Sequence, residues 1–185
     1  MRKQQQAPRD VIDFWFSESA KDKWWKSNQA FDEEIRQRFS DLHRRAKAGE
    51  LRDWRVTPEG RLAEIIVLDQ FSRNMFRNSG EAFAQDELAR MLTRQAVACG
   101  ADQALPVQQR AFLYLPLMHS ESLDDHVEAM KLFASDPGLA SNLDFEIRHK
   151  AIIERFGRYP HRNEVLGRKS TKAELDFLQQ PGSSF

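Results

Sequence analysis

The stretch Thr57–Phe76, TPEGRLAEIIVLDQFSRNMF, decides the fold of this chain of 185 residues. Thr57 followed by Pro58 is typical of a helix start, because a threonine hydroxyl caps free backbone N–H groups and proline fits the first helical position. The helix that follows is apolar on most of its sides. The stretch therefore predicts a central, buried helix against which other helices pack.

Helical signals continue on both sides of this stretch. Phe31, Ile35, Phe39 and Leu42 share one face of a helix that Gly49 would end. Val, Ile and Thr together number only 17, which argues against a strand-rich fold. Further helices are expected over residues 8–18 and 139–156, and from Pro160 to near Gly167. Capping signals at Asn78, Ser122 and Thr171 each predict the start of another helix. One more helix is expected to begin at Pro106, with a kink or stop near Leu115.

These signals predict an all-α protein of about eight or nine helices. The short connections contain no linker rich in proline, glycine or serine that would divide the chain. We therefore expect one all-α domain over residues 8–180, with a flexible N-terminus at 1–7 and a C-terminal tail at 181–185.

The charge balance excludes several classes of protein. Lys and Arg together number 28, and Asp and Glu together also number 28, so the formal net charge is zero. A zero net charge argues against a general nucleic-acid or membrane-surface binder, but not against a local charged patch. The single cysteine excludes a disulfide framework, and no apolar run is long enough for a transmembrane helix. The first ten residues lack the apolar centre of a secretory signal, so a cytoplasmic protein is expected.

Asp69 is a polar residue at a position where the helix pattern predicts core. It shares a stripe with Leu62 and Ile65, and a buried carboxylate needs a partner. Arg73, four residues later, is the natural one. The pair is either a structural ion pair between packed helices or the floor of a cleft, with Arg77 one turn further along.

Two histidines also occupy informative positions. His149 shares an apolar stripe with Ile152 and Phe156, which suits either a hydrogen-bonded core residue or a group of a functional site. His119 ends a helix that contains Pro116. A helix C-terminus stabilises a cationic histidine, whereas a gap opened by the proline would suit a ligand site.

A basic segment lies near the C-terminus: residues 147–172 contain eight Lys or Arg and two Glu. His161, Arg162 and Asn163 fall at the expected start of a short helix, whose free N–H groups favour an anion. The alternative is a solvated basic surface, or arginines that tie the C-terminal segment to acidic helices. The side chains able to make paired contacts with phosphate or carboxylate are Arg158, Arg162 and Arg168.

Familiar catalytic and cofactor motifs are missing, among them HExxH, GxSxG, the glycine-rich phosphate loop and the Rossmann fingerprint. A metal site built from His119, Glu121, His149 and His161 is chemically feasible, but these spacings match no recognised ligand pattern. We therefore predict neither a metal nor a cofactor.

Five stretches resemble, in order, the bacterial family called domain of unknown function 924. They are VIDFWF at 11–16, LAEIIVLDQFSRNMFR at 62–77, FLYLPLMHSE at 112–121, FEIRHKAIIERFGRYPHRNEVLGRKST at 145–171 and AELDFL at 173–178. The resemblance covers about residues 10–178. It implies a tetratricopeptide-like array of stacked antiparallel helix pairs with a concave face. Ser72 and His126 depart mildly from the family's pattern, and the family has no assigned activity.

The motifs shared with this family imply that polar residues from four segments form one functional cleft, whose members would include Arg73, His149, Arg162 and Asn163. A binding module for an anionic small molecule or a peptide carboxylate is the first hypothesis. An enzyme, with or without assistance from a metal ion, is the second, with His149 or His161 as general acid or base and Asp69 orienting an arginine. RNA binding through the basic C-terminal segment is the third and is poorly supported, because few aromatic residues interleave the basic ones. A pure scaffold role is the fourth. The predicted ligand-binding residues are Arg73, Asn74, Arg77, His119, His149, Arg158, His161, Arg162, Asn163 and Arg168.

Overall fold

A computed structural model describes residues 6–185, and this part of the chain contains nine α-helices, five short 3₁₀ helices and no strand. The all-α prediction is confirmed. Of the predicted flexible N-terminus at 1–7, residues 1–5 lie outside the described part. The α-helices are α1 (Pro8–Trp15), α2 (Glu18–Lys21), α3 (Gln29–Lys47), α4 (Pro58–Met75), α5 (Asp86–Ala98), α6 (Val107–Met118), α7 (Leu123–Phe133), α8 (Ala140–Phe156) and α9 (Lys172–Leu178).

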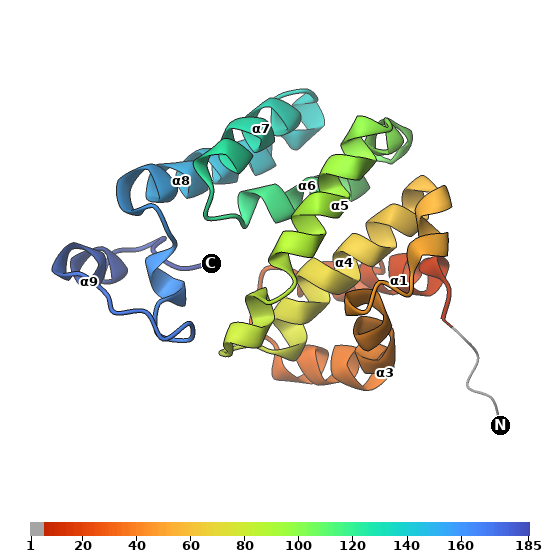
Figure 1. The fold of residues 1–185 in the computed structure, drawn as a ribbon, viewed down its shortest axis with the longest axis horizontal. Helices are drawn as coiled ribbons and strands as arrows, with labels where there is room; N and C mark the ends of the chain where they lie inside the picture. Colours follow the sequence, from red (N-terminus) through yellow and green to blue (C-terminus); the bar gives the residue numbers. More distant parts are fainter. Residues whose placement is uncertain (1–5) are drawn as a thin grey trace.

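Helix α4 is the central helix that the sequence predicts (Figure 1). Its N-terminus is capped as expected, because the Gly60 N–H donates to the Thr57 hydroxyl at 3.1 Å. Fourteen of its 18 residues are buried. It packs against α1, α3, α5 and α6, so residues on different sides of α4 face different parts of the protein.

The buried apolar residues form two clusters of unequal size. The larger one spans α1 to α7 and contains most of the core, including Phe39, Phe71 and Leu113. The smaller one contains Ile152, Ile153 and Tyr159. Figure 1 shows α7, α8 and α9 on one side of the molecule, α1, α3 and α4 on the other, and α5 and α6 between them. The C-terminal part therefore has a small apolar core of its own.

Several helix ends differ from the prediction. The hydroxyl of Ser79, rather than Asn78, accepts the Glu81 N–H, and it caps the 3₁₀ helix η2 (Gly80–Phe83) ahead of α5. Ser122 makes no side-chain cap. Of the kink or stop expected near Leu115, the stop is wrong: α6 runs through Pro116 to Met118, since a proline in the last turn removes one bond from a helix about to end.

The remaining connections are short 3₁₀ helices. The segment expected to form a short helix from Pro160 to Gly167 contains only a three-residue one, followed by turns. The capping box of Thr171 and Glu174 is present at the start of α9. The other 3₁₀ helices are η1 (Arg52–Val56), η3 (Ala101–Ala104), η4 (Pro137–Leu139) and η5 (Pro160–Arg162).

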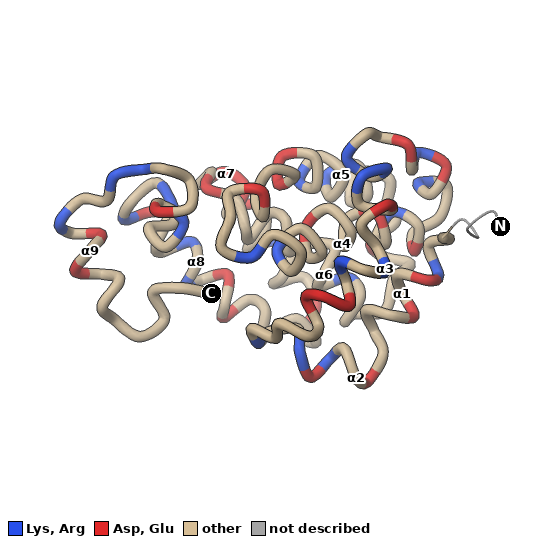
Figure 2. The backbone as a smooth tube through the Cα atoms, turned by 90° about the horizontal axis from the view of Figure 1, so that it is seen from below, with Lys and Arg blue, Asp and Glu red and all other residues tan. Residues whose placement is uncertain are grey.

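Charged positions of both signs are spread along the chain, and basic positions are prominent around α8 and α9 (Figure 2). No helix among the described residues has the length and apolar character needed to cross a membrane. The tetratricopeptide-like stacking stays a prediction.

Candidate functional site

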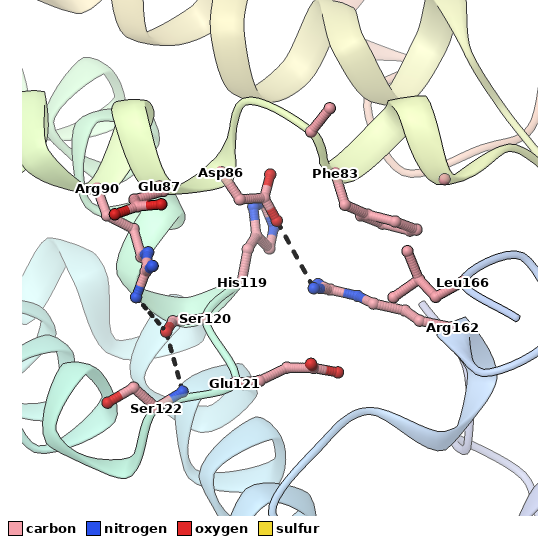
Figure 3. Close-up of a pocket in the computed structure, with 12 residues that line it drawn as sticks. Phe83, Asp86, Glu87, Arg90, His119, Ser120, Glu121, Ser122, Arg162 and Leu166 are labelled. Atoms are coloured by element: carbon pink, nitrogen blue, oxygen red, sulfur yellow. Dashed lines mark hydrogen bonds and ion pairs between the residues drawn. The ribbon is translucent and has the colours of Figure 1, made fainter. Parts of the chain in front are cut away.

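A cavity of about 530 Å³ opens where three separate stretches of the chain meet (Figure 3). Small-molecule sites have volumes of roughly 300–1,000 Å³, so a metabolite-sized ligand would fit. One wall comes from η2 and the first turns of α5, the second from the connection between α6 and α7, and the third from η5 and the turn after it. The lining residues are Gly80, Phe83, Ala84, Asp86, Glu87, Arg90, His119, Ser120, Glu121, Ser122, Arg162 and Leu166.

Asp69 of α4 lies behind this cavity and is only 1% exposed. Its Oδ1 is 2.9 Å from an Arg73 guanidinium nitrogen and 2.8 Å from His119 Nδ1. Its Oδ2 accepts from the Gln70 amide at 2.7 Å. Burial by itself would raise the pKa of Asp69, but the charge of Arg73 and the contact with His119 outweigh it and hold that pKa well below its usual range.

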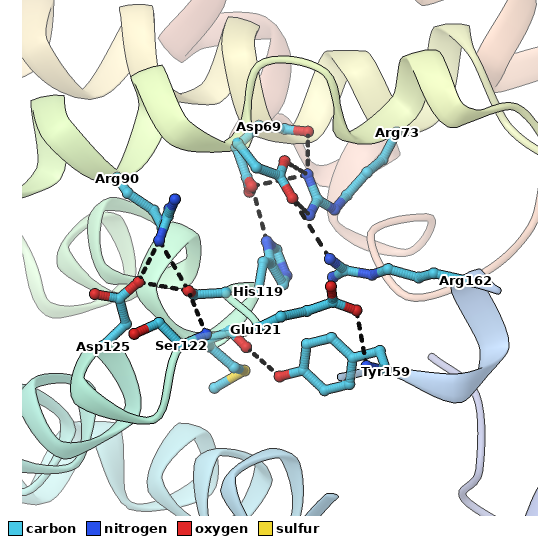
Figure 4. Close-up of polar contacts among 12 residues, drawn as sticks. Asp69, Arg73, Arg90, His119, Glu121, Ser122, Asp125, Tyr159 and Arg162 are labelled. Carbon is cyan, nitrogen blue, oxygen red and sulfur yellow. Dashed lines mark hydrogen bonds and ion pairs between the residues drawn. The ribbon is translucent and has the colours of Figure 1, made fainter. Parts of the chain in front are cut away.

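His119 connects Asp69 to the cavity (Figure 4). Burial, followed by the positive charge of Arg73, lowers the pKa of His119, so the ring is neutral near pH 7. Because the Asp69 carboxylate only accepts, His119 Nδ1 carries the proton and donates it to Asp69. Nε2 then bears a lone pair. It makes no hydrogen bond within the described part of the chain, and the residue lines the cavity.

Arg162 of η5 is the most incompletely paired buried cation of the site. Its side chain is 6% exposed, and the nearest carboxylate oxygen, from Asp86, is 3.6 Å away. The guanidinium lies 4.4 Å from the centre of the Phe83 ring and 4.6 Å from that of Tyr159. Its Nε is buried without a partner among the residues described. Burial, and then the charge of Arg73, lowers the pKa of Arg162 to about 10, so it stays cationic at pH 7.

Most other charges at the cavity are neutralised by partners. Arg73 makes a paired contact with Asp86, at 2.9 and 3.0 Å. Arg168 does the same with Glu121, at 2.7 and 2.9 Å. Burial opposes ionisation of Glu121, yet the bond from Arg168 brings its pKa below the ordinary value.

The structure brings Asp69, Arg73, His119 and Arg162 together, and of these four residues His119 and Arg162 line the cavity. Of the four residues expected to share one cleft, which are Arg73, His149, Arg162 and Asn163, only Arg162 lines the cavity. His149 and His161 lie nearby but line no part of the cavity: their rings are 5.8 and 5.7 Å from that of Tyr159. Burial lowers the pKa of His149 to about 3, and burial with the charge of Arg162 lowers the pKa of His161 to about 4.

The ring of Phe185 packs on both of these histidines, with centroid distances of 3.8 Å to His149 and 4.6 Å to His161. His149 Nδ1 is 2.7 Å from the Phe145 carbonyl, to which it donates. His149 is therefore a buried, hydrogen-bonded core residue, which is one of the two interpretations that its apolar stripe allows.

Two other predicted residues, Asn74 and Arg77, lie elsewhere. Both bind Asp32 of α3: the Asn74 amide donates at 2.7 Å, and Arg77 donates at 2.6 and 2.8 Å. Five residues separate Asn74 from Asp69, a rotation of about 140° around the helix. These contacts tie α4 to α3 and leave Asn74 and Arg77 outside the cavity lining.

The remaining C-terminal residues hold their own segment together. Arg158 contacts Glu174 at 2.7 and 2.9 Å. Asn163 donates to Ser170 at 3.0 Å and accepts from Arg168 at 3.0 Å. Arg158 and Asn163 therefore hold the C-terminal segment together internally, whereas Arg168, through Glu121, ties it to the connection between α6 and α7.

The sequence pattern did not identify the residues of η2 and α5 that line the cavity. Asp86 and Glu87 occupy a first helical turn, where acidic residues are ordinary because they suit the helix dipole. No feature of the sequence marks Phe83 as a residue of a ligand site. Of the suggested metal ligands, His119 and Glu121 line the cavity, and within the described range no three His, Cys, Asp or Glu side chains are placed to hold a metal ion.

Comparisons with known proteins agree with the fold. The solved structure of ATU0120, a protein of unknown function from Agrobacterium tumefaciens, is 39% identical in sequence with a TM-score of 0.87, and the match covers 93% of this chain and 96% of that chain. No curated protein matches. The family described as bacterial protein of unknown function (DUF924) matches residues 11–182. This match spans nearly the whole sequence, so the resemblance is confirmed and the chain belongs to the DUF924 family.

Proposed function

We propose that the cavity binds a small anionic molecule through Arg162. The observation that carries this proposal is a buried guanidinium with a weak ion pair at 3.6 Å and no hydrogen bond among the described residues. A buried cation is costly unless it is paired and hydrogen-bonded. A ligand carboxylate or phosphate would supply the missing acceptors, because a guanidinium presents paired donors that match either group.

The rings of Phe83 and Tyr159 support this role. They lie against the Arg162 guanidinium at 4.4 and 4.6 Å, so they restrict the plane in which it can turn. A cation held in a fixed orientation loses little side-chain freedom when a ligand binds. Lysine offers a point charge without paired, planar donors, so Arg162→Lys should bind anions more weakly than the wild type.

The test is a thermal-shift titration with sodium acetate, sodium phosphate and matched sodium chloride. A ligand at 100 times its Kd stabilises a protein by about 2.7 kcal/mol, which for this chain length raises Tm by roughly 5–10 °C. The rise should vanish in Arg162→Gln. It should persist in Arg52→Gln, which removes the same charge from an exposed position outside the cavity. Equal rises in the wild type and Arg162→Gln would reject the proposal.

The pair of Asp69 and His119 favours a second candidate function, acid–base catalysis on the bound anion. Asp69 orients the ring at 2.8 Å, and Nε2 is free to take a proton from a bound molecule. Arg162 would stabilise negative charge that develops on that molecule. In this arrangement His119 replaces His149 and His161 as the acid–base residue.

Proton NMR tests this second function directly. Each carboxylate that binds is incubated with the protein in D₂O, and loss of its C–H signals is followed; conversion here means that His119 removes a C–H proton and a deuteron from solvent takes its place. Catalysis by His119 predicts conversion by the wild type and none by His119→Gln, while binding of the same anion is retained. Conversion that survives in His119→Gln would contradict the role.

A further inference from the structure

Glu87 carries the second unpaired charge of the cavity. It belongs to the first turn of α5 and lines the cavity. Its side chain is exposed, and it makes no ion pair or hydrogen bond among the described residues. Asp86 and Glu121 are each engaged by an arginine at hydrogen-bond distance. Once these internal pairs are counted, the cavity offers one incompletely paired cation, Arg162, and one free carboxylate, Glu87.

The two charges lie on different walls. Arg162 comes from η5, and Glu87 follows Asp86, the carboxylate nearest to Arg162. Figure 3 shows Glu87 and Arg162 on opposite sides of His119. A molecule that reaches from one wall to the other would meet a positive charge at one end and a negative charge at the other.

We propose that the ligand of this cavity is a small zwitterion of the amino-acid type, whose anionic end binds Arg162 and whose ammonium binds Glu87. The inference rests on the proposed anion-binding function and narrows its ligand class. An anion without an ammonium would leave Glu87 unpaired and add a second negative charge to the same cavity. A zwitterion instead gives each charge a partner and leaves the net charge of the cavity unchanged.

The two contacts differ in strength because they differ in burial. Arg162 is almost fully buried, and its contact with the anion supplies most of the affinity. Glu87 is exposed to water, where an ion pair is screened. We therefore expect the ammonium to add a gain in affinity of roughly two- to fivefold. Glu87 then selects among anions that Arg162 already accepts.

The experiment is isothermal titration calorimetry at pH 7 with matched pairs of probes. Each pair consists of a carboxylate and its ω-amino form: acetate and glycine, propionate and β-alanine, butyrate and 4-aminobutyrate, hexanoate and 6-aminohexanoate. Ethyl phosphate and phosphoethanolamine form the corresponding phosphate pair, and butylamine serves as a cation alone. The spacing that gives the largest gain reports the span between the two charges.

Two variants identify the residue responsible. Glu87→Gln should abolish the gain from the ammonium while the simple carboxylate or phosphate binds as well as before or better. Glu59→Gln removes an exposed carboxylate outside the cavity lining and should leave the gain intact. Arg162→Gln should weaken both members of every pair.

The outcomes separate this inference from the proposed function. If simple anions bind through Arg162 but no ammonium adds affinity, or if the gain survives in Glu87→Gln, the zwitterion is wrong and anion binding stands. Butylamine binding as tightly as the best zwitterion would also overturn the inference. If no anion binds, both proposals fail.

Discussion

Replacement of Asp69 by asparagine tests the electrostatic reasoning about the site. Asparagine keeps the shape of the side chain but removes its charge. In the wild type, the carboxylate contacts Arg73 at 2.9 Å and His119 at 2.8 Å, and it is fully buried. The substitution therefore removes one partner of a buried ion pair and leaves the other in place.

The expected loss of stability follows from the remaining contacts. Removing one partner of a buried ion pair costs about 3–5 kcal/mol, because a buried charge is left without compensation. Arg73 keeps both hydrogen bonds to Asp86, so the lower end applies, about 3 kcal/mol. For a chain of this length, the corresponding decrease in Tm is roughly 6–12 °C.

The loss should depend on pH in a defined direction. Arg73 and His119 overcome the effect of burial and lower the pKa of Asp69 in the folded state, whereas the unfolded value is about 3.9. A carboxyl with a lowered folded pKa contributes its full stabilisation above the unfolded pKa and loses it as the pH falls. The difference between the wild type and Asp69→Asn should therefore be largest near pH 7 and shrink below about pH 4.

Urea denaturation at pH 7, 5 and 3 measures both effects, with unchanged m-values as the check on two-state unfolding. Asp32→Asn is the matched comparison, because Asp32 pairs with Arg77, whose side chain is 36% exposed. Its loss should be smaller, about 1–2 kcal/mol. A loss below about 1 kcal/mol for Asp69→Asn, or a loss that is equal at pH 7 and pH 3, would refute the reasoning.

Three further substitutions have clear expected outcomes. Burial raises the pKa of Glu146 in the folded state, so the stability that this carboxyl contributes is present below the unfolded pKa of about 4.3 and is lost as the pH rises. Glu146→Gln should therefore gain stability relative to the wild type as the pH rises from about 4 to 8. A difference in the free energy of unfolding in urea that stays the same across this range would contradict the prediction. Gly60→Ala would place a Cβ 1.9 Å from the Trp54 carbonyl oxygen, so a loss of about 2 kcal/mol or more is expected in the same assay. Tyr159→Phe removes the hydrogen bond to the Met118 carbonyl at 2.5 Å and should lower the free energy of unfolding by about 1 kcal/mol. Anion binding should persist, since the ring beside Arg162 remains. Loss of acetate or phosphate binding in calorimetry would show that the hydroxyl matters as well.

Local signals in the sequence account for much of the fold. The caps at Thr57 and Thr171 depend on residues within one helical turn, and both are present. The pair of Asp69 and Arg73 follows from spacing on one helix. The cap expected at Ser122 did not form: the carboxylate of Asp125, three residues later, binds Arg90 of α5 at 2.6 Å instead of the helix N-terminus. Such a competing contact between helices leaves no trace in local spacing.

The candidate site was predictable only in part, for a similar reason. Among the three arginines Arg158, Arg162 and Arg168, only Arg162 lines the cavity. Their segment is a short 3₁₀ helix and turns, so no periodicity indicates which way each side chain points. In the sequence Glu87 is an ordinary acidic residue of a helical first turn; only the fold places it on the same cavity as Arg162.

The division of the core into two clusters bears on how the cavity is held together. The wall that carries Arg162 follows directly after Tyr159 of the smaller cluster. Polar contacts join it to the rest, among them the Tyr159 N–H with Glu121 at 2.8 Å and Arg168 with the same carboxylate. Local opening of this junction would break these hydrogen bonds and would also expose Tyr159, which is fully buried and bonded to the Met118 carbonyl. A ligand that contacts both sides of the junction would oppose this opening, so amide hydrogen exchange along residues 159–168 should become slower as ligand occupancy increases.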